Sequence, residues 1–112
     1  MTDRDEGLYL ADIRYAVERI LRYTSGGRGE FFEDPMRQDA VIRNLEVMGE
    51  AVRRISDTTR DAHPEVSWRQ IAAIRHRALQ GYFSVDLEIV WEIVATELPR
   101  LREALRGLQP SS

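Results

Sequence analysis

Hydrophobic residues recur along the chain at alternating intervals of three and four, the spacing that places them on one face of an α-helix. One stripe predicts a helix over about residues 5–23 and consists of Leu10, Ile13, Val17, Ile20 and Thr24. A second predicts a helix over about residues 35–55 and consists of Val41, Leu45, Met48, Val52 and Ile55. The last predicts a helix over about residues 87–108 and consists of Leu87, Trp91, Val94, Leu98, Leu101, Leu105 and Leu108. The alternation that marks a β-strand is not found.

Glycine, proline and polar residues mark the ends of the first two helices. Three glycines within residues 26–29 end the first helix, because glycine in a helix costs backbone entropy. Acidic residues just before Pro35 predict the second start, since they suit a helix N-terminus and proline is tolerated there. Residues 56–64 are a polar connector, in which His63 is a solvated loop residue without a role. Gly49 stands inside the second helix, and we expect close approach of a neighbouring helix to explain it.

The remaining chain predicts a shorter helix followed by the long last one. The shorter helix opens near Trp68 and ends near Gly81, a residue type common just past a helix end. Either Ser84 or Asp86 caps the last helix. Pro99 falls inside that helix and predicts either a kink of the rod or a restart of the helix after Leu98.

Together these elements predict one domain over residues 1–112. The fold class is all-α, an antiparallel bundle of four or five helices joined by short connections. The stripes on three helices are longer than a small monomer needs to bury. They therefore predict a homodimer.

The amino-acid composition and the net charge limit the classes of function that are expected. Hydrophobic residues make up 43% and charged residues 31%, a globular balance. No apolar run approaches the roughly 20 residues that span a bilayer, and no secretory signal is present, so we expect no membrane contact and a cytoplasmic location. With no cysteine and two histidines, no metal site is expected. The net charge of −3 does not indicate nucleic-acid binding. Sixteen arginines and no lysine reflect either a composition bias or a use of arginine for phosphate.

Residues 74–83 gather polar groups that a plain amphipathic helix does not need. On an ideal helix, His76 and Gln80 lie about 40° apart, whereas Arg75 and Gln80 lie about 140° apart. Arg75 and Tyr82 align to within about 20° if the helix lasts that long. Arg75 and Gln80 converge only if the helix unwinds near its end or if two copies face each other across a dimer axis. Paired arginines of that kind suit a phosphodiester. The alternative is that the cations and His76 are solvated and Tyr82 is a core residue.

Three segments resemble those of one known family. They are residues 42–51 (IRNLEVMGEA), residues 68–71 (WRQI), and residues 90–94 (VWEIV) followed by Leu98 and Pro99. The chain resembles, over nearly its whole length, the HepT-like branch of the HEPN proteins. These are small all-helical toxins paired with an MntA-type minimal nucleotidyltransferase antitoxin.

The family's motif is an arginine, a polar residue, three variable residues, a histidine, one variable residue and a tyrosine. Arg75 and Tyr82 match its ends, His76 stands at the polar position and Gln80 stands at the histidine position. The resemblance implies RNA cleavage at a dimer interface without metal or cofactor, with the arginine and the histidine as the catalytic pair. It also implies that the antitoxin silences the toxin by attaching AMP to the tyrosine, here Tyr82.

Gln80 is the departure from this pattern. Glutamine cannot exchange a proton near neutral pH, and loss of a general acid or base typically costs about 10²–10⁴-fold in rate. The chain is then a naturally weakened toxin, an engineered inactive one, or one in which His76 supplies the imidazole.

Two hypotheses about the function follow. The first is a ribonuclease toxin that uses Arg75 for phosphate, with His76 or Gln80 as auxiliaries. The second is a catalytically silent dimeric module that only engages the nucleotidyltransferase.

Overall fold

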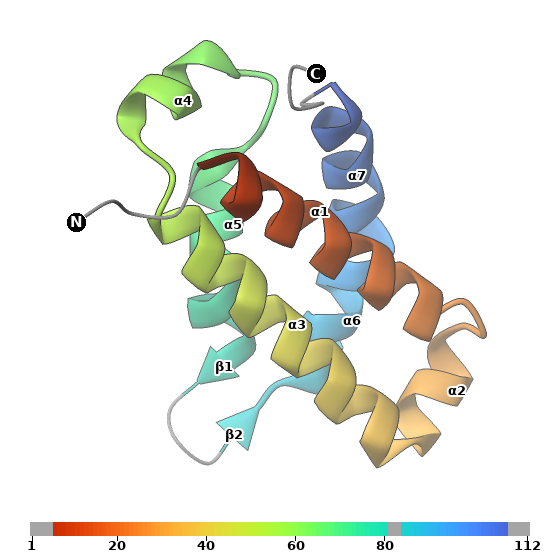
Figure 1. Cartoon of the computed structure of the whole chain (residues 1–112). Helices are drawn as coiled ribbons and strands as arrows, with labels where there is room; N and C mark the ends of the chain where they lie inside the picture. Colours follow the sequence, from red (N-terminus) through yellow and green to blue (C-terminus); the bar gives the residue numbers. More distant parts are fainter. Residues whose placement is uncertain (1–5, 81–83, 108–112) are drawn as a thin grey trace.

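Four long helical rods run in alternating directions (Figure 1), and three of them correspond to the stripes of the sequence. In this computed structural model the described residues are 6–80 and 84–107. The rods are α1 (Glu6–Tyr23), α3 (Pro35–Arg53), α5 (Trp68–Ala78) and a continuous last rod of α6 (Leu87–Glu92), the π-helical segment η1 (Ile93–Glu97) and α7 (Leu98–Arg106). Two short helices, α2 (Arg28–Glu33) and α4 (Asp57–Ala62), join them, and two-residue strands β1 (Leu79–Gln80) and β2 (Ser84–Val85) pair antiparallel. The predicted all-α bundle is confirmed.

The hydrophobic stripes form the core of a single chain. α1 packs on α3 and α7, and α5 packs on α3 and α6. Fully or almost fully buried stripe positions are Ile13, Val17, Ile20, Val41, Leu45, Met48, Val52, Ile55, Val94, Leu98, Leu101 and Leu105. Because one chain buries most of these positions, the stripes themselves give no argument for a second copy. None of the described helices combines the length and the apolar character needed to cross a membrane.

Acidic caps set the starts of α3 and α6. The Asp34 side chain accepts hydrogen bonds from the backbone N–H groups of the two residues after Pro35, at 3.0 and 3.2 Å. The predicted helix start at Pro35 is confirmed. Asp86 caps α6 in the same way, accepting from the second and third residues of the helix at 3.0 and 3.2 Å. Of the two caps that the sequence offered, Asp86 is therefore the one used.

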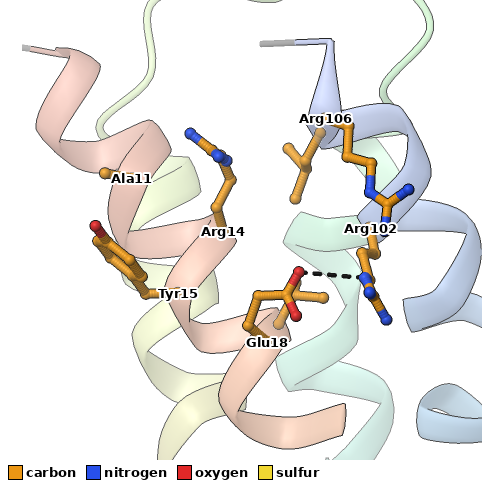
Figure 2. Close-up of a pocket in the computed structure, with 8 residues that line it drawn as sticks. Ala11, Arg14, Tyr15, Glu18, Arg102 and Arg106 are labelled. Atoms are coloured by element: carbon orange, nitrogen blue, oxygen red, sulfur yellow. Dashed lines mark ion pairs between the residues drawn. The ribbon is translucent and has the colours of Figure 1, made fainter. Parts of the chain in front are cut away.

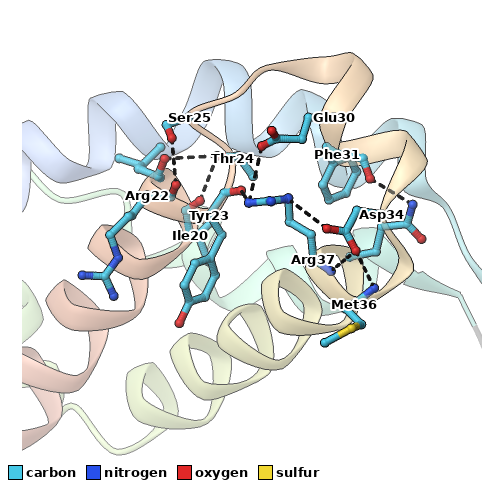
Figure 3. Close-up of polar contacts among 12 residues, drawn as sticks. Ile20, Arg22, Tyr23, Thr24, Ser25, Glu30, Phe31, Asp34, Met36 and Arg37 are labelled. Atoms are coloured by element: carbon cyan, nitrogen blue, oxygen red, sulfur yellow. Dashed lines mark hydrogen bonds and ion pairs between the residues drawn. The ribbon is translucent and has the colours of Figure 1, made fainter.

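The helix α2 corrects the prediction that residues 26–29 are only a break. Gly27, with φ of 94°, turns the chain, and its carbonyl accepts a hydrogen bond from the Phe31 N–H at 3.1 Å. Phe31 is fully buried, with its ring centroid 5.6 Å from that of Trp91 in α6. Burial of this one aromatic side chain holds a helix that local propensity does not predict. Arg37 adds a polar link, donating to the Tyr23 carbonyl at 2.6 Å (Figure 3).

A further expectation is corrected in the connector, and the last rod shows how the chain accommodates Pro99. The connector over residues 56–64 contains α4, capped by the Ser56 hydroxyl, which accepts from the Thr59 N–H at 3.2 Å. In the last rod, α7 begins at Leu98 with Pro99 in its first turn, and it follows η1 without a gap. The π-helical segment η1 precedes it, and the Leu98 N–H bonds to the carbonyl of Ile93, five residues back. A π-helical turn accommodates the irregularity that proline imposes on the backbone hydrogen bonds.

Candidate functional site

The helix α5 carries the predicted motif and is held by its apolar side. Its buried residues are Trp68, Ile71, Ile74 and Ala78. The Trp68 indole N–H donates to the carbonyls of Arg60 and His63 at 3.1 and 3.0 Å, which fixes the start of the helix against α4. These contacts define the rotation of α5 about its axis. They therefore decide which polar side chains point outward.

Arg75 lies where α5 passes close to α3. A Cβ atom placed on Gly49 would lie 3.7 Å from Arg75 Cβ and 3.9 Å from Arg75 Cδ, and Gly49 itself is buried. The predicted close approach of a neighbouring helix at Gly49 is confirmed, and the neighbour is the stem of Arg75. Arg75 remains exposed, and it has no hydrogen-bond or ion-pair partner among the described residues. Its guanidinium is therefore available to an external anion.

His76 follows on the outward side of α5 and is also exposed. An exposed imidazole can accept a proton from, or donate one to, a hydroxyl group of a ligand whose phosphate the adjacent guanidinium holds. Among the described residues, no group of three His, Cys, Asp or Glu side chains is placed to hold a metal ion.

The third cation of α5, Arg77, is used differently. Its Nη1 and Nη2 donate to Glu97 Oε1 and Oε2 at 2.8 and 2.7 Å, and Gln70 Nε2 donates to Glu97 Oε1 at 2.9 Å. The Glu97 side chain is only 16% exposed. Its hydrogen bonds to Arg77 raise the pKa of that guanidinium further. This Arg77–Glu97–Gln70 clamp ties α5 to the end of η1, so Arg77 is not free to bind a ligand.

The sequence reasoning missed Gln70 and Glu97. A signal was present on α5, because Gln70 and Arg77 are seven residues apart and so share one helix side. The carboxylate that both contact comes from another helix, twenty residues beyond Arg77. Spacing within α5 could not identify it.

Gln80 is not on the helix. α5 ends at Ala78, three residues before the predicted end at Gly81, and Gln80 lies in β1 opposite Ser84. The helical relation that put Gln80 about 40° from His76 is therefore wrong. Pairing between β1 and β2 satisfies backbone groups that would otherwise bond within a further turn of α5. Tyr82 lies outside the described residues.

A second group of arginines borders a groove between α1 and α7 (Figure 2). The guanidiniums come from Arg14, Arg102 and Arg106. Arg102 Nε lies 3.2 Å from Glu18 Oε2, and Arg106 Nη1 lies 3.0 Å from Glu103 Oε2. Neighbouring carboxylates thus neutralise two of the three cations. The groove is a weaker anion site than the exposed side of α5.

Comparisons with known proteins agree on one family. A family model described as ribonuclease HepT-like matches residues 13–108. The chain is 39% identical to the protein named "Probable ribonuclease HepT" of Thermococcus cleftensis, over 90% of this chain and 93% of that one. It is 33% identical to "Putative RNase TTE0752" of Caldanaerobacter subterraneus subsp. tengcongensis, over 89% of this chain and 90% of that one.

A longer relative shares the same region. The chain is 34% identical to "Gamma-glutamylcyclotransferase and putative RNase MJ0434" of Methanocaldococcus jannaschii, over 91% of this chain but only 46% of that protein. The chain thus spans less than half of this relative. No solved structure matches the chain.

Proposed function

The chain belongs to the ribonuclease HepT-like family, and we propose that it is a ribonuclease toxin of a toxin–antitoxin pair that binds RNA with Arg75 on α5. The observation that carries the proposal is the exposure of Arg75. Its stem rests against Gly49, and its guanidinium is exposed and free of carboxylates among the described residues. A planar guanidinium with several donors suits a phosphodiester.

The proposed chemistry needs no metal. In the proposed step the ribose 2′-oxygen bonds to phosphorus and the bond from phosphorus to the 5′-oxygen breaks, while Arg75 holds the non-bridging phosphate oxygens and stabilises the negative charge on them. His76, one residue later and exposed, is the imidazole that can move a proton. Glutamine at position 80 can donate or accept hydrogen bonds but cannot carry a proton near neutral pH. The proposed activity is therefore attenuated rather than absent.

We propose further that two copies pair so that their α5 helices form one shared site. Exposed apolar side chains support a second chain: Leu8, Tyr15, Met36 and Val85. Val85 matters most, because it pairs with Leu79 directly after α5 and is 39% exposed. The proposed dimer covers Val85, which lies close in sequence to the end of α5, and sets the two α5 helices next to each other.

The proposed partner is an MntA-type nucleotidyltransferase antitoxin that silences the toxin at Tyr82. In that step the phenolic oxygen bonds to the α-phosphorus of ATP and pyrophosphate leaves. The attached AMP places a negative phosphodiester seven residues beyond Arg75 and six residues beyond His76. Such a phosphate competes with RNA for the same cations.

The test is RNA cleavage by the purified protein, with Arg75→Ala as the variant and Arg43→Ala as the matched control. Arg43 is also exposed, but it borders the α1–α3 groove. We expect cleavage that Arg75→Ala abolishes and that Arg43→Ala leaves intact. Intact RNA with the native chain contradicts an active toxin.

Gln80 supports one other function, that of a silent dimeric module that binds the nucleotidyltransferase without cutting RNA. Under this alternative, Gln80→His creates cleavage that the parent lacks. Equal cleavage rates in the parent and in Gln80→His contradict it.

A further inference from the structure

One segment of this acidic chain contains no acidic residue. Nineteen Asp and Glu residues are spread along 112 positions, yet none falls between Glu65 and Asp86. The segment includes all of α5 and its three arginines. Glu97 neutralises Arg77, but Arg69 and Arg75 have no carboxylate partner among the described residues, and such cations attract polyanions although the net charge is −3.

The cations of α5 point to three sides of the helix. The Arg75 stem lies against α3, about 120° around the axis from Arg69. On another side, Arg77 and Gln70 are occupied by the partly buried clamp to Glu97. On the outward side lie Arg69 and His76, seven residues apart and therefore within about 20° of each other around the axis. Both are exposed, and among the described residues neither has a hydrogen-bond or ion-pair partner. Arg69 is thus a second free guanidinium on the helix.

The side chains on the helix surface between these two residues are small. Ala72 and Ala73 lie between Arg69 and His76 on the outward side, and Ala72 is exposed. Small side chains allow a nucleic-acid backbone to approach the helix closely. Seven residues of helix separate Arg69 from His76 by about 10 Å along the axis. The two ends of this path can therefore contact different phosphates of one strand.

We infer that Arg69 is a second phosphate-binding residue and that single-stranded RNA crosses the exposed surface of α5, from Arg69 and His76 past Ala72 to Arg75, which lies about 120° from Arg69 around the axis. This inference rests on the proposed function and extends it from a cleavage point to a binding path. An exposed, flexible single strand fits better than a duplex, because a short convex helix offers no groove that matches a double helix.

The test is binding of a fluorescently labelled single-stranded RNA of mixed sequence to the full chain, measured by anisotropy at several salt concentrations. The variants are Arg69→Ala, Arg69→Lys and Arg75→Ala. Arg43→Ala is the control because it removes the same charge from an exposed position on α3. Circular dichroism checks that each variant keeps its helix content, which we expect since alanine favours helix at an exposed position.

We expect Arg69→Ala to weaken binding roughly three- to tenfold at low salt and to make the salt slope shallower by about 0.7, the value for one phosphate contact on a single strand. Arg69→Lys should keep most of the slope, because it keeps the charge. Arg43→Ala should change neither quantity.

Three outcomes overturn the inference, and they are distinguishable. If the parent binds RNA and only Arg75→Ala weakens it, the proposed function stands and the path through Arg69 is wrong. If Arg43→Ala and Arg69→Ala weaken RNA binding equally, the loss depends only on the net charge of the protein. Arg69 then makes no specific contact with a phosphate. If the parent binds no RNA, both the path and the proposed function fail.

Discussion

Gly49 and Arg75 face each other across the contact between α3 and α5, with only 3.7 Å between Arg75 Cβ and the place where a Cβ of residue 49 would stand. This distance is an ordinary van der Waals contact. One methyl group therefore fits at position 49, whereas a larger side chain has to displace the stem of Arg75. The glycine that interrupts the α3 pattern thereby helps to set the position of the proposed RNA-binding guanidinium.

Position 49 gives two opposite predictions. Gly49→Ala should raise the free energy of unfolding by up to about 1 kcal/mol, because alanine favours helix and the added methyl group meets no clash. Gly49→Leu should leave a helical protein but displace Arg75 and weaken RNA binding about as much as Arg75→Ala does. Urea unfolding and RNA anisotropy measure the two effects. Unchanged RNA affinity in a folded Gly49→Leu protein contradicts the positioning role.

The Glu97 clamp should contribute measurable stability. Glu97→Ala removes the acceptor of three hydrogen bonds and leaves Arg77 partly buried without its partner. Hydrogen bonds to charged groups and partial solvent screening together suggest a loss of about 1–2 kcal/mol. Glu103→Ala is the control, since its ion pair with Arg106 is exposed on both sides and should contribute little. Urea unfolding measures the free energy of unfolding of both variants. Equal values for Glu97→Ala and Glu103→Ala contradict a structural role of the clamp.

Phe31 should be the residue on which α2 depends. Phe31→Ala removes a fully buried ring that packs against Trp91, and such changes cost about 3–5 kcal/mol. Phe31→Leu keeps most of the buried volume and should cost less. Hydrogen exchange of the α2 amides, followed with the free energy of unfolding, shows whether the helix is lost first. A cost below that of a substitution at an exposed position, such as Met36→Leu, contradicts the anchoring role.

The periodic stripes predict α1, α3 and the last rod because long helices repeat their buried positions many times. Short α2 has too few turns to show a period, and it forms because Phe31 is buried by distant Trp91. For the candidate site, the sequence motif selects Arg75 and His76, and both are exposed in the structure; their role stays a prediction. The motif cannot place Gln80, because the end of α5 depends on pairing between β1 and β2, which is a tertiary contact. Glu97 is missed for the same reason, since its partners lie on another helix.

Acid should affect the contact between α2 and α6 through Glu88. A hydrogen bond from Arg28 lowers the pKa of Glu88 below its ordinary value. Because the folded pKa is the lower one, the small stabilisation is present above the unfolded pKa and disappears as pH falls through the folded value. NMR titration of the Glu88 carboxyl carbon should show a midpoint that rises in Arg28→Ala. An unchanged midpoint in that variant contradicts the pairing.

Gln80→His is the substitution that separates an attenuated enzyme from a silent module. It places an imidazole at the motif position directly after α5, and imidazole can exchange a proton near neutral pH whereas the amide cannot. If His76 only assists, Gln80→His should raise the cleavage rate by about 10²–10⁴-fold over the parent. Gln80→Asn is the control, because it keeps an amide and should leave the rate near that of the parent. The gain must vanish in the double variant with Arg75→Ala, since a proton carrier acts only on a phosphate that is held. A parent rate that Gln80→His does not change, but that His76→Ala abolishes, assigns the proton transfer to His76 instead.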